Sequence, residues 1–131
     1  MKYLLDTNIW LEALLKQEKS EEVVRFLDKY SGDVLVISDF SLHSILIILT
    51  RFKEFEVADM FLDDIIDSAI EIISVKPDRL KEVLKIIETY NVNFDDAYQY
   101  HIAKNHNLIL VSSDKDFDKT GILRKTPEDL I

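Results

Sequence analysis

The sequence predicts an α/β fold with a central parallel sheet of four to five strands in one domain over residues 1–131. Short apolar runs alternate with longer segments whose apolar residues recur at helical spacing. Glycine and proline are scarce, with two of each, and 47% of the 131 residues are hydrophobic. A chain of this length and composition can bury one substantial core, so we expect a compact, helix-rich domain.

The first third of the chain predicts one strand and two helices. Residues 2–6 form a short apolar run that ends in Asp6, which is typical of a strand followed by a helix start. A helical stretch follows at residues 8–16. Ser20 is expected to cap a helix over residues 21–30, which has acids in its first turn and apolar residues at helical spacing.

The middle of the chain repeats this alternation. Residues 34–37 are entirely apolar and rich in β-branched side chains, the pattern of a buried parallel strand. Ser38 can cap a helix that runs to about Phe52. An amphipathic helix is predicted at residues 56–68 and a third strand at residues 70–75.

The last third predicts two helices and two strands. Pro77 precedes a helix over residues 78–90, and Asn93 can cap a second helix that ends near Asn105. Residues 108–111 predict a fourth strand and residues 122–124 a short fifth. Strands joined by helices form right-handed parallel crossovers.

Composition and charge exclude several classes of protein. The chain has no cysteine, which excludes disulfides and thiolate metal sites and favours a reducing cytoplasm. No secretory signal is visible, and the most apolar run, residues 40–49, is too short to span a membrane. A formal net charge of −9 argues against a general nucleic-acid coat.

Aspartates recur where the predicted strands end or helices begin. Asp6 ends the first strand, and Asp114 follows the fourth. Asp95 and Asp96 fall in the first turn of the helix capped by Asn93. Ligands of open α/β sheets bind outside the carboxyl ends of the strands, so these acids converge if strands one and four are neighbours.

Clustered carboxylates indicate a divalent metal and phosphate chemistry. Mg²⁺ and Mn²⁺ prefer hard oxygen ligands, and such an ion can activate water and neutralise charge on a phosphate. The same acids also have plain structural interpretations. Asp6-Thr7-Asn8 suits a helix cap, Asp95 and Asp96 suit a helix dipole, and the acids from Asp114 onward suit a solvated loop.

At these residues the chain resembles the PIN-domain family, which includes the VapC-type ribonuclease toxins of prokaryotic toxin–antitoxin pairs. The matching motifs are Leu-Leu-Asp-Thr-Asn at the start, Ile-Ser-x-x-x-Leu in the middle, then Asp-Ala and Ser-x-Asp-x-Asp-Phe. Asp96 and Asp114 are 114 − 96 = 18 residues apart, which fits the family. The resemblance covers essentially the whole chain.

The resemblance implies a three-layer α/β/α domain, an Mg²⁺ or Mn²⁺ site and endoribonuclease activity on RNA. The matching metal-binding acids are Asp6, Asp96 and Asp114, while Asp116 matches a further acid of the last motif. Thr7 and Ser112 match hydroxyl residues that orient these carboxylates, and Asn8 is an expected helper. The resemblance also implies frequent homodimers and, for a toxin, a small antitoxin that inserts a basic residue among the acids.

One position departs from the family pattern. Ser44 stands where many members carry a glutamate, and a hydroxyl binds a divalent ion poorly, so a four-carboxylate site would lack one member. Neighbouring His43 could contact metal or phosphate, although packing is the commoner role for a lone histidine. Asp39 is a comparable outside candidate. Tyr98 and Tyr100 could stack on bases, but core or interface positions are expected.

Two other functions remain open at this level. Ser44 and the charge of −9 motivate a catalytically weak or silent domain that binds RNA or protein. An aspartate after a first strand can also be a phosphoryl-accepting nucleophile. The phosphatase pattern has a second aspartate two residues later, where this chain has Asn8.

Overall fold

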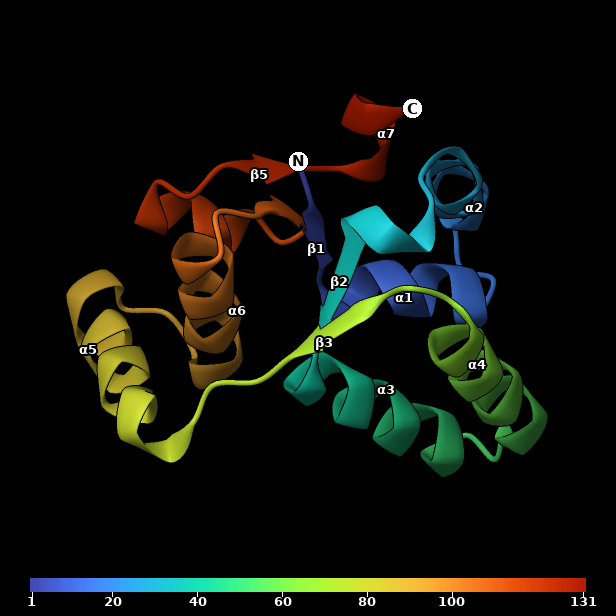
Figure 1. Ribbon diagram of the computed structural model, residues 1–131, viewed down its shortest axis with the longest axis horizontal. Coiled ribbons are helices and arrows are strands. Elements are labelled where there is room, and N and C mark those ends of the chain that lie inside the picture. The colour runs from blue at the N-terminus through green and yellow to red at the C-terminus, as the bar shows by residue number, and fades with distance from the viewer.

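The computed structural model describes all residues, Met1–Ile131, and confirms the predicted α/β architecture. Five parallel strands form one sheet in the order β3-β2-β1-β4-β5 (Figure 1). The strands are β1 Tyr3–Leu5, β2 Leu35–Ser38, β3 Glu71–Ile73, β4 Ile109–Val111 and β5 Arg124–Lys125. Because β1 lies between β2 and β4, the condition for convergence of the acids is met.

Seven α-helices and three short 3₁₀ helices connect and flank the strands. The α-helices are α1 Thr7–Leu14, α2 Ser20–Lys29, α3 Asp39–Arg51, α4 Phe55–Asp67, α5 Leu80–Tyr90, α6 Phe94–Asn105 and α7 Pro127–Leu130. The 3₁₀ helices are η1 Gly32–Val34, η2 Pro77–Arg79 and η3 Lys115–Thr120. No helix combines the length and hydropathy needed to cross a lipid bilayer.

The helices cover both faces of the sheet, as a three-layer arrangement requires (Figure 1). Strand side chains alternate between the faces: Leu5 and Val111 pack with α1 to α4, while Leu4 and Leu110 pack with α6 and η3. Helix α5 packs beside α6 and buries Val83 against Ala97. The three central strands, β2, β1 and β4, are therefore apolar on both sides, which explains their continuous apolar runs.

Several predicted boundaries differ from the structure. Ser20 is the first residue of α2 rather than its cap, because Lys19 occupies the N-cap position without a side-chain bond. Asn93 is the N-cap of α6, but its side chain makes no capping hydrogen bond. Ser38 does cap α3, accepting a hydrogen bond from the Ser41 amide at 3.0 Å. The fifth strand begins two residues later than predicted, at Arg124, and ends at Lys125.

The short helical turns were missed because their sequence signals are weak. η2 accounts for the start of the helix predicted from residue 78, so α5 itself begins at Leu80. η3 turns the acidic segment after β4 back over the sheet, where Phe117 is fully buried. α7 is only four residues long and is held by a capping box between Thr126 and Asp129.

Candidate metal centre

A cavity of about 570 Å³ lies at the carboxyl ends of β1 and β4, beside the N-terminus of α6. Most of the predicted site residues line this cavity, although they come from distant parts of the chain. Its polar lining is Asp6, Thr7, Asn8, Ser44, Asp95, Asp96, Gln99 and Asp114. The remaining lining is apolar and consists of Leu11, Phe40, Ile48 and Phe94.

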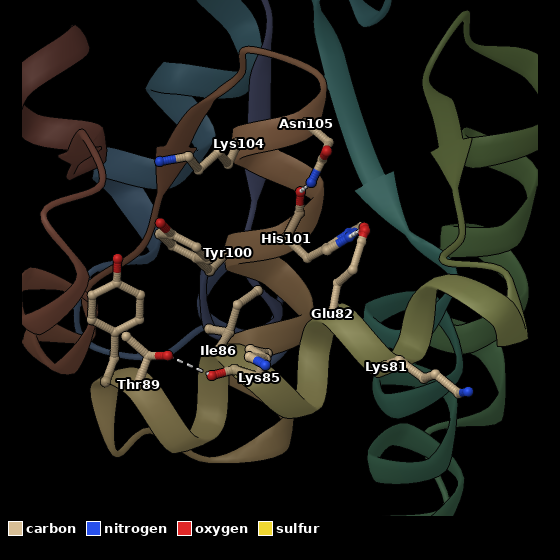
Figure 2. Close-up of a pocket in the computed structure, with 10 residues that line it drawn as sticks. Lys81, Glu82, Lys85, Ile86, Thr89, Tyr100, His101, Lys104 and Asn105 are labelled. Atoms are coloured by element: carbon tan, nitrogen blue, oxygen red, sulfur yellow. Dashed lines mark hydrogen bonds and ion pairs between the residues drawn. The ribbon is translucent and has the colours of Figure 1, made fainter.

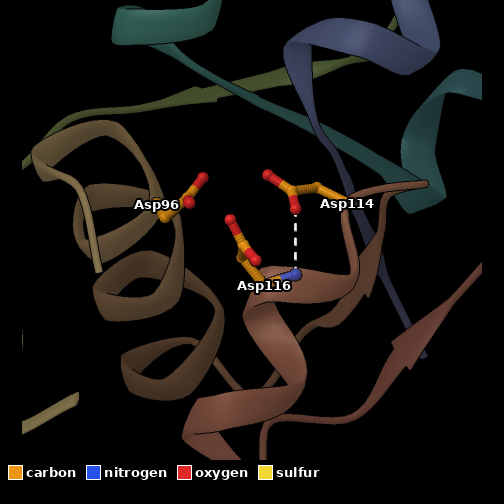
Figure 3. A group of neighbouring side chains, drawn as sticks. All are labelled: Asp96, Asp114 and Asp116. Atoms are coloured by element: carbon orange, nitrogen blue, oxygen red, sulfur yellow. Dashed lines mark hydrogen bonds between the residues drawn. The ribbon is translucent and has the colours of Figure 1, made fainter. Parts of the chain in front are cut away.

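Three carboxylates approach one another closely at this edge. Asp96, Asp114 and Asp116 each offer an oxygen within 4.8 Å of the others, and Figure 3 shows the three side chains directed toward a common space. Asp96 comes from α6, while the other two come from the turn into η3. The Asp116 amide donates to Asp114 Oδ1 at 2.9 Å, which fixes the spacing of the pair.

Asp6 lies at the floor of the cavity and is held by neutral donors. Its Oδ1 accepts hydrogen bonds from the Thr7 amide at 2.9 Å and from Gln99 Nε2 at 3.1 Å. Its Oδ2 accepts from Ser112 Oγ at 2.8 Å. An ionised carboxylate has about four lone-pair sites, so one site on Oδ2 remains for a further partner.

Strand register explains the contact between Asp6 and Ser112. Leu5 of β1 pairs with Val111 of β4, so the residues that follow them emerge side by side. Ser112 Oγ also accepts a hydrogen bond from the Asp114 amide at 3.0 Å, and Arg124 Nη1 donates to the Ser112 carbonyl at 3.0 Å. Ser112 therefore links Asp6 to the trio formed by Asp96, Asp114 and Asp116.

Burial and mutual repulsion perturb two of the acids. Burial raises the pKa of Asp96 to about 7, with further contributions from the charges of Asp95, Asp114, Asp6 and Asp116. Burial also raises the pKa of Asp6, although hydrogen bonds from Gln99, Ser112 and the Thr7 amide oppose the rise. A cation among these carboxylates would relieve the repulsion. Hard oxygen donors in such a group fit Mg²⁺ or Mn²⁺.

Gln99 and Ser41 belong to the site although the sequence did not single them out. Gln99 is 2% exposed, and its Nε2 also donates to Ser41 Oγ at 2.9 Å. Ser41 Oγ is hydrogen-bonded to Thr7 Oγ1 at 2.8 Å. The available signal was spacing, because Gln99 follows Asp96 by one helical turn and so shares its face of α6.

The outside candidates lie away from the acids. His43 is exposed and does not line the cavity, so it is neither a packed histidine nor a member of the acidic site. Asp39 accepts hydrogen bonds from Tyr98 Oη at 2.7 Å and from the Phe40 amide at 2.8 Å, which is a structural role. Tyr98 and Tyr100 are both 5% exposed, as expected for core positions.

A second cavity of about 510 Å³ lies between α5 and α6 (Figure 2). Its lining includes Lys81, Lys85 and Lys104. The buried His101 lies there with its Nε2 3.3 Å from Glu82. It contains none of the predicted acids, although Tyr100 lines it, and Glu82 is its only carboxylate. The acidic chemistry is thus confined to the first cavity.

Solved structures of several prokaryotic proteins have the same fold as this chain. A toxin–antitoxin complex from Klebsiella pneumoniae is 19% identical, with a TM-score of 0.75 over 96% of this chain and 98% of that one. The sarcin–ricin loop cleaving toxin VapC20 of Mycobacterium tuberculosis is 15% identical, with a TM-score of 0.80 over 92% and 96%. VapBC2 of Rickettsia felis, bound to a promoter DNA fragment, is 22% identical, with a TM-score of 0.71 over 96% and 98%.

Sequence comparison gives the family directly. No curated protein matches the sequence. The family model of the PIN domain, in contrast, matches residues 3–123, which include every acid of the site and end before helix α7. The chain therefore belongs to the PIN-domain family.

Proposed function

We propose that this protein is a cytoplasmic endoribonuclease that requires Mg²⁺ or Mn²⁺ and acts, as one domain, as the toxin of a toxin–antitoxin pair. The observation that carries the proposal is the approach of three carboxylates within 4.8 Å of one another, beside a cavity with Asp6 at its floor. Membership of the PIN-domain family and the toxins among the structural relatives support it.

The residues that would hold the ion are Asp96 and Asp114, with Asp6 and Asp116 as further acids of the same cluster. When bound, the ion would offset the charge of the phosphate and activate water for hydrolysis. Asp6 is oriented for this role by Ser112 and by the Thr7 amide. Gln99 adds a third neutral donor, so Asp6 keeps its position without a neighbouring cation.

Cleavage of RNA by site variants tests the proposal. Asp6→Asn, Asp96→Asn and Asp114→Asn should each abolish cleavage that depends on added Mg²⁺ or Mn²⁺, because each removes a charge from the cluster. Asp63→Asn is the matched control, since Asp63 is an exposed acid on α4 outside the cavity. Full activity of the Asp6→Asn and Asp96→Asn proteins would rule out this mechanism.

The second candidate function is a silent PIN domain that binds RNA or protein without cutting. The observation that favours it is Ser44, which lines the cavity and supplies no charge where a fourth ligand would be expected. Calorimetric titration with Mn²⁺ separates the two functions. Uptake by the wild type, and its loss in Asp96→Asn, would count against a silent domain.

An antitoxin and a second copy of the chain are the proposed protein partners. Helices α3 and α4 expose several large apolar side chains, and a surface of this kind favours protein contact. They are Ile47 on α3 and Phe55, Met60 and Ile66 on α4, joined by Phe52 in the segment between the helices. Native mass spectrometry of the purified chain would detect a homodimer, and affinity capture from the native host would recover a small protein with a basic segment.

A further inference from the structure

The lining of the acidic cavity combines two kinds of side chain. The carboxylates of Asp6, Asp96 and Asp114 form its acidic part, called the acidic wall, and the rings of Phe40 and Phe94 form its aromatic part, called the aromatic wall. The proposed metal site does not use the aromatic wall. Phe94 remains 41% exposed although it lies only two residues before the buried Asp96, so the cavity has an aromatic surface with no assigned role.

The aromatic wall is built on a fixed base. Phe40 and Phe94 have ring centroids 6.1 Å apart, and each contacts the ring of Tyr98, at 5.5 and 6.0 Å respectively. Tyr98 is immobilised because its hydroxyl donates to Asp39 at 2.7 Å and accepts from the Val75 amide at 2.9 Å. Phe94 is therefore the open end of a three-ring cluster whose inner members are packed.

We propose that Phe94, supported by Phe40, is a stacking surface for the nucleobase next to the scissile phosphate. This inference rests on the proposed ribonuclease function and adds a specificity element to it. A nucleotide joins an anionic group, which a metal-loaded acidic wall would take, to a flat apolar ring, which Phe94 can cover. An apolar protein side chain would use the aromatic wall and leave the acidic wall without a partner.

Stacking on an aromatic ring is worth roughly 1–3 kcal/mol for each base, which corresponds to roughly 5- to 150-fold in affinity. Removal of the base and removal of the ring should each cause this loss. Because both changes delete the same contact, the two losses should not add when they are combined. This non-additivity distinguishes stacking from a general effect of Phe94 on the fold.

The experiment is a cycle of enzyme and substrate changes. An oligoribonucleotide that wild-type protein cleaves at one bond is selected from a random-sequence pool and then remade with one abasic position at a time. Cleavage is measured with the wild type, Phe94→Ala and Phe94→Trp. Leu84→Ala is the matched control, because Leu84 is an apolar side chain on α5 that is 55% exposed and outside the cavity.

For the wild type, KM should rise roughly 5- to 150-fold at one abasic position beside the cleaved bond. Phe94→Ala should show the same rise in KM on intact RNA and no further rise on that abasic substrate. Phe94→Trp should restore the wild-type KM on intact RNA and the rise on the abasic substrate. If the losses from the abasic position and from Phe94→Ala multiply, or if Phe94→Ala has the wild-type KM, the stacking surface is overturned and the proposed ribonuclease function is not. Absence of any cleavage by the wild type would overturn the proposed function as well.

Discussion

Asp96→Asn should stabilise the metal-free protein, although it should abolish activity. The Asp96 carboxylate accepts no hydrogen bond in the structure and is 7% exposed among four other acids. Replacing it with the amide removes a disfavoured charge and breaks no contact. The gain should depend on pH, because only the ionised form of Asp96 is penalised.

The magnitude follows from the pKa of Asp96, which is raised from 3.8 to about 7. One pKa unit corresponds to about 1.4 kcal/mol, so the full difference is about 4 kcal/mol. Because Asp96 faces a cavity that admits water, we expect Asp96→Asn to raise the free energy of unfolding by about half of this difference, or about 2 kcal/mol. The raised pKa lowers the wild-type free energy of unfolding as pH increases from about 4 to about 7, and the penalty is constant above that window.

The assay is urea unfolding in the presence of a chelator, followed by fluorescence of the single tryptophan, Trp10, which is buried at 5% exposure. The free energy of unfolding of Asp96→Asn should exceed that of the wild type by about 2 kcal/mol at pH 8 and by about half of that at pH 5.5. Asp63→Asn should change stability by less than about 0.5 kcal/mol at either pH. A gain that is equal at both pH values, or no gain at pH 8, would refute the reasoning. Saturating Mn²⁺ should stabilise the wild type more than Asp96→Asn.

Further substitutions test the supporting structure. Gln99→Leu should cost about 1–3 kcal/mol in chemical unfolding, because Asp6 and Ser41 each lose a buried donor, and an unchanged midpoint would contradict this role. Phe117→Ala should cost about 3–5 kcal/mol in the same assay, since the ring is fully buried beneath η3. Ser44→Glu should tighten Mn²⁺ binding in calorimetry by adding a carboxylate to the cavity, and weaker binding would show that the glutamate cannot reach the ion. Gly121→Ala should cost about 1–2 kcal/mol in thermal unfolding, because Gly121 has a φ of 72°, and no loss would show that the turn readjusts.

Alternation of residue character made the fold class predictable. Strands β1 to β4 are short and mostly apolar, and the segments between them have the apolar spacing of helices, so the number and order of the main elements followed from local pattern. The fifth strand, Arg124–Lys125, is charged and was placed only approximately. Boundaries were less well predicted, because helix starts such as Ser20 depend on contacts that a pattern does not contain. The 3₁₀ turns were missed for the same reason.

The acids of the site were visible as residues at the ends of predicted elements, and Asp6, Asp96 and Asp114 do line one cavity. Asp116 was expected only as a further acid, yet it completes the trio, because the turn into η3 brings its carboxylate beside Asp114. Gln99 and Ser41 had no distinguishing motif. Their role arises only when α3 and α6 pack on either side of Asp6.

The sequence by itself determined which side chains lie at strand and helix ends, because those positions depend on propensity and apolar period within a few residues. Only the tertiary structure decided which of them meet. The pairing of β1 with β4 brings Asp6 to Ser112, and the packing of α6 against that edge brings Asp96 within reach of Asp114. The first contact joins residues 106 apart in the chain and the second joins two separate elements, and local pattern contains no information on either.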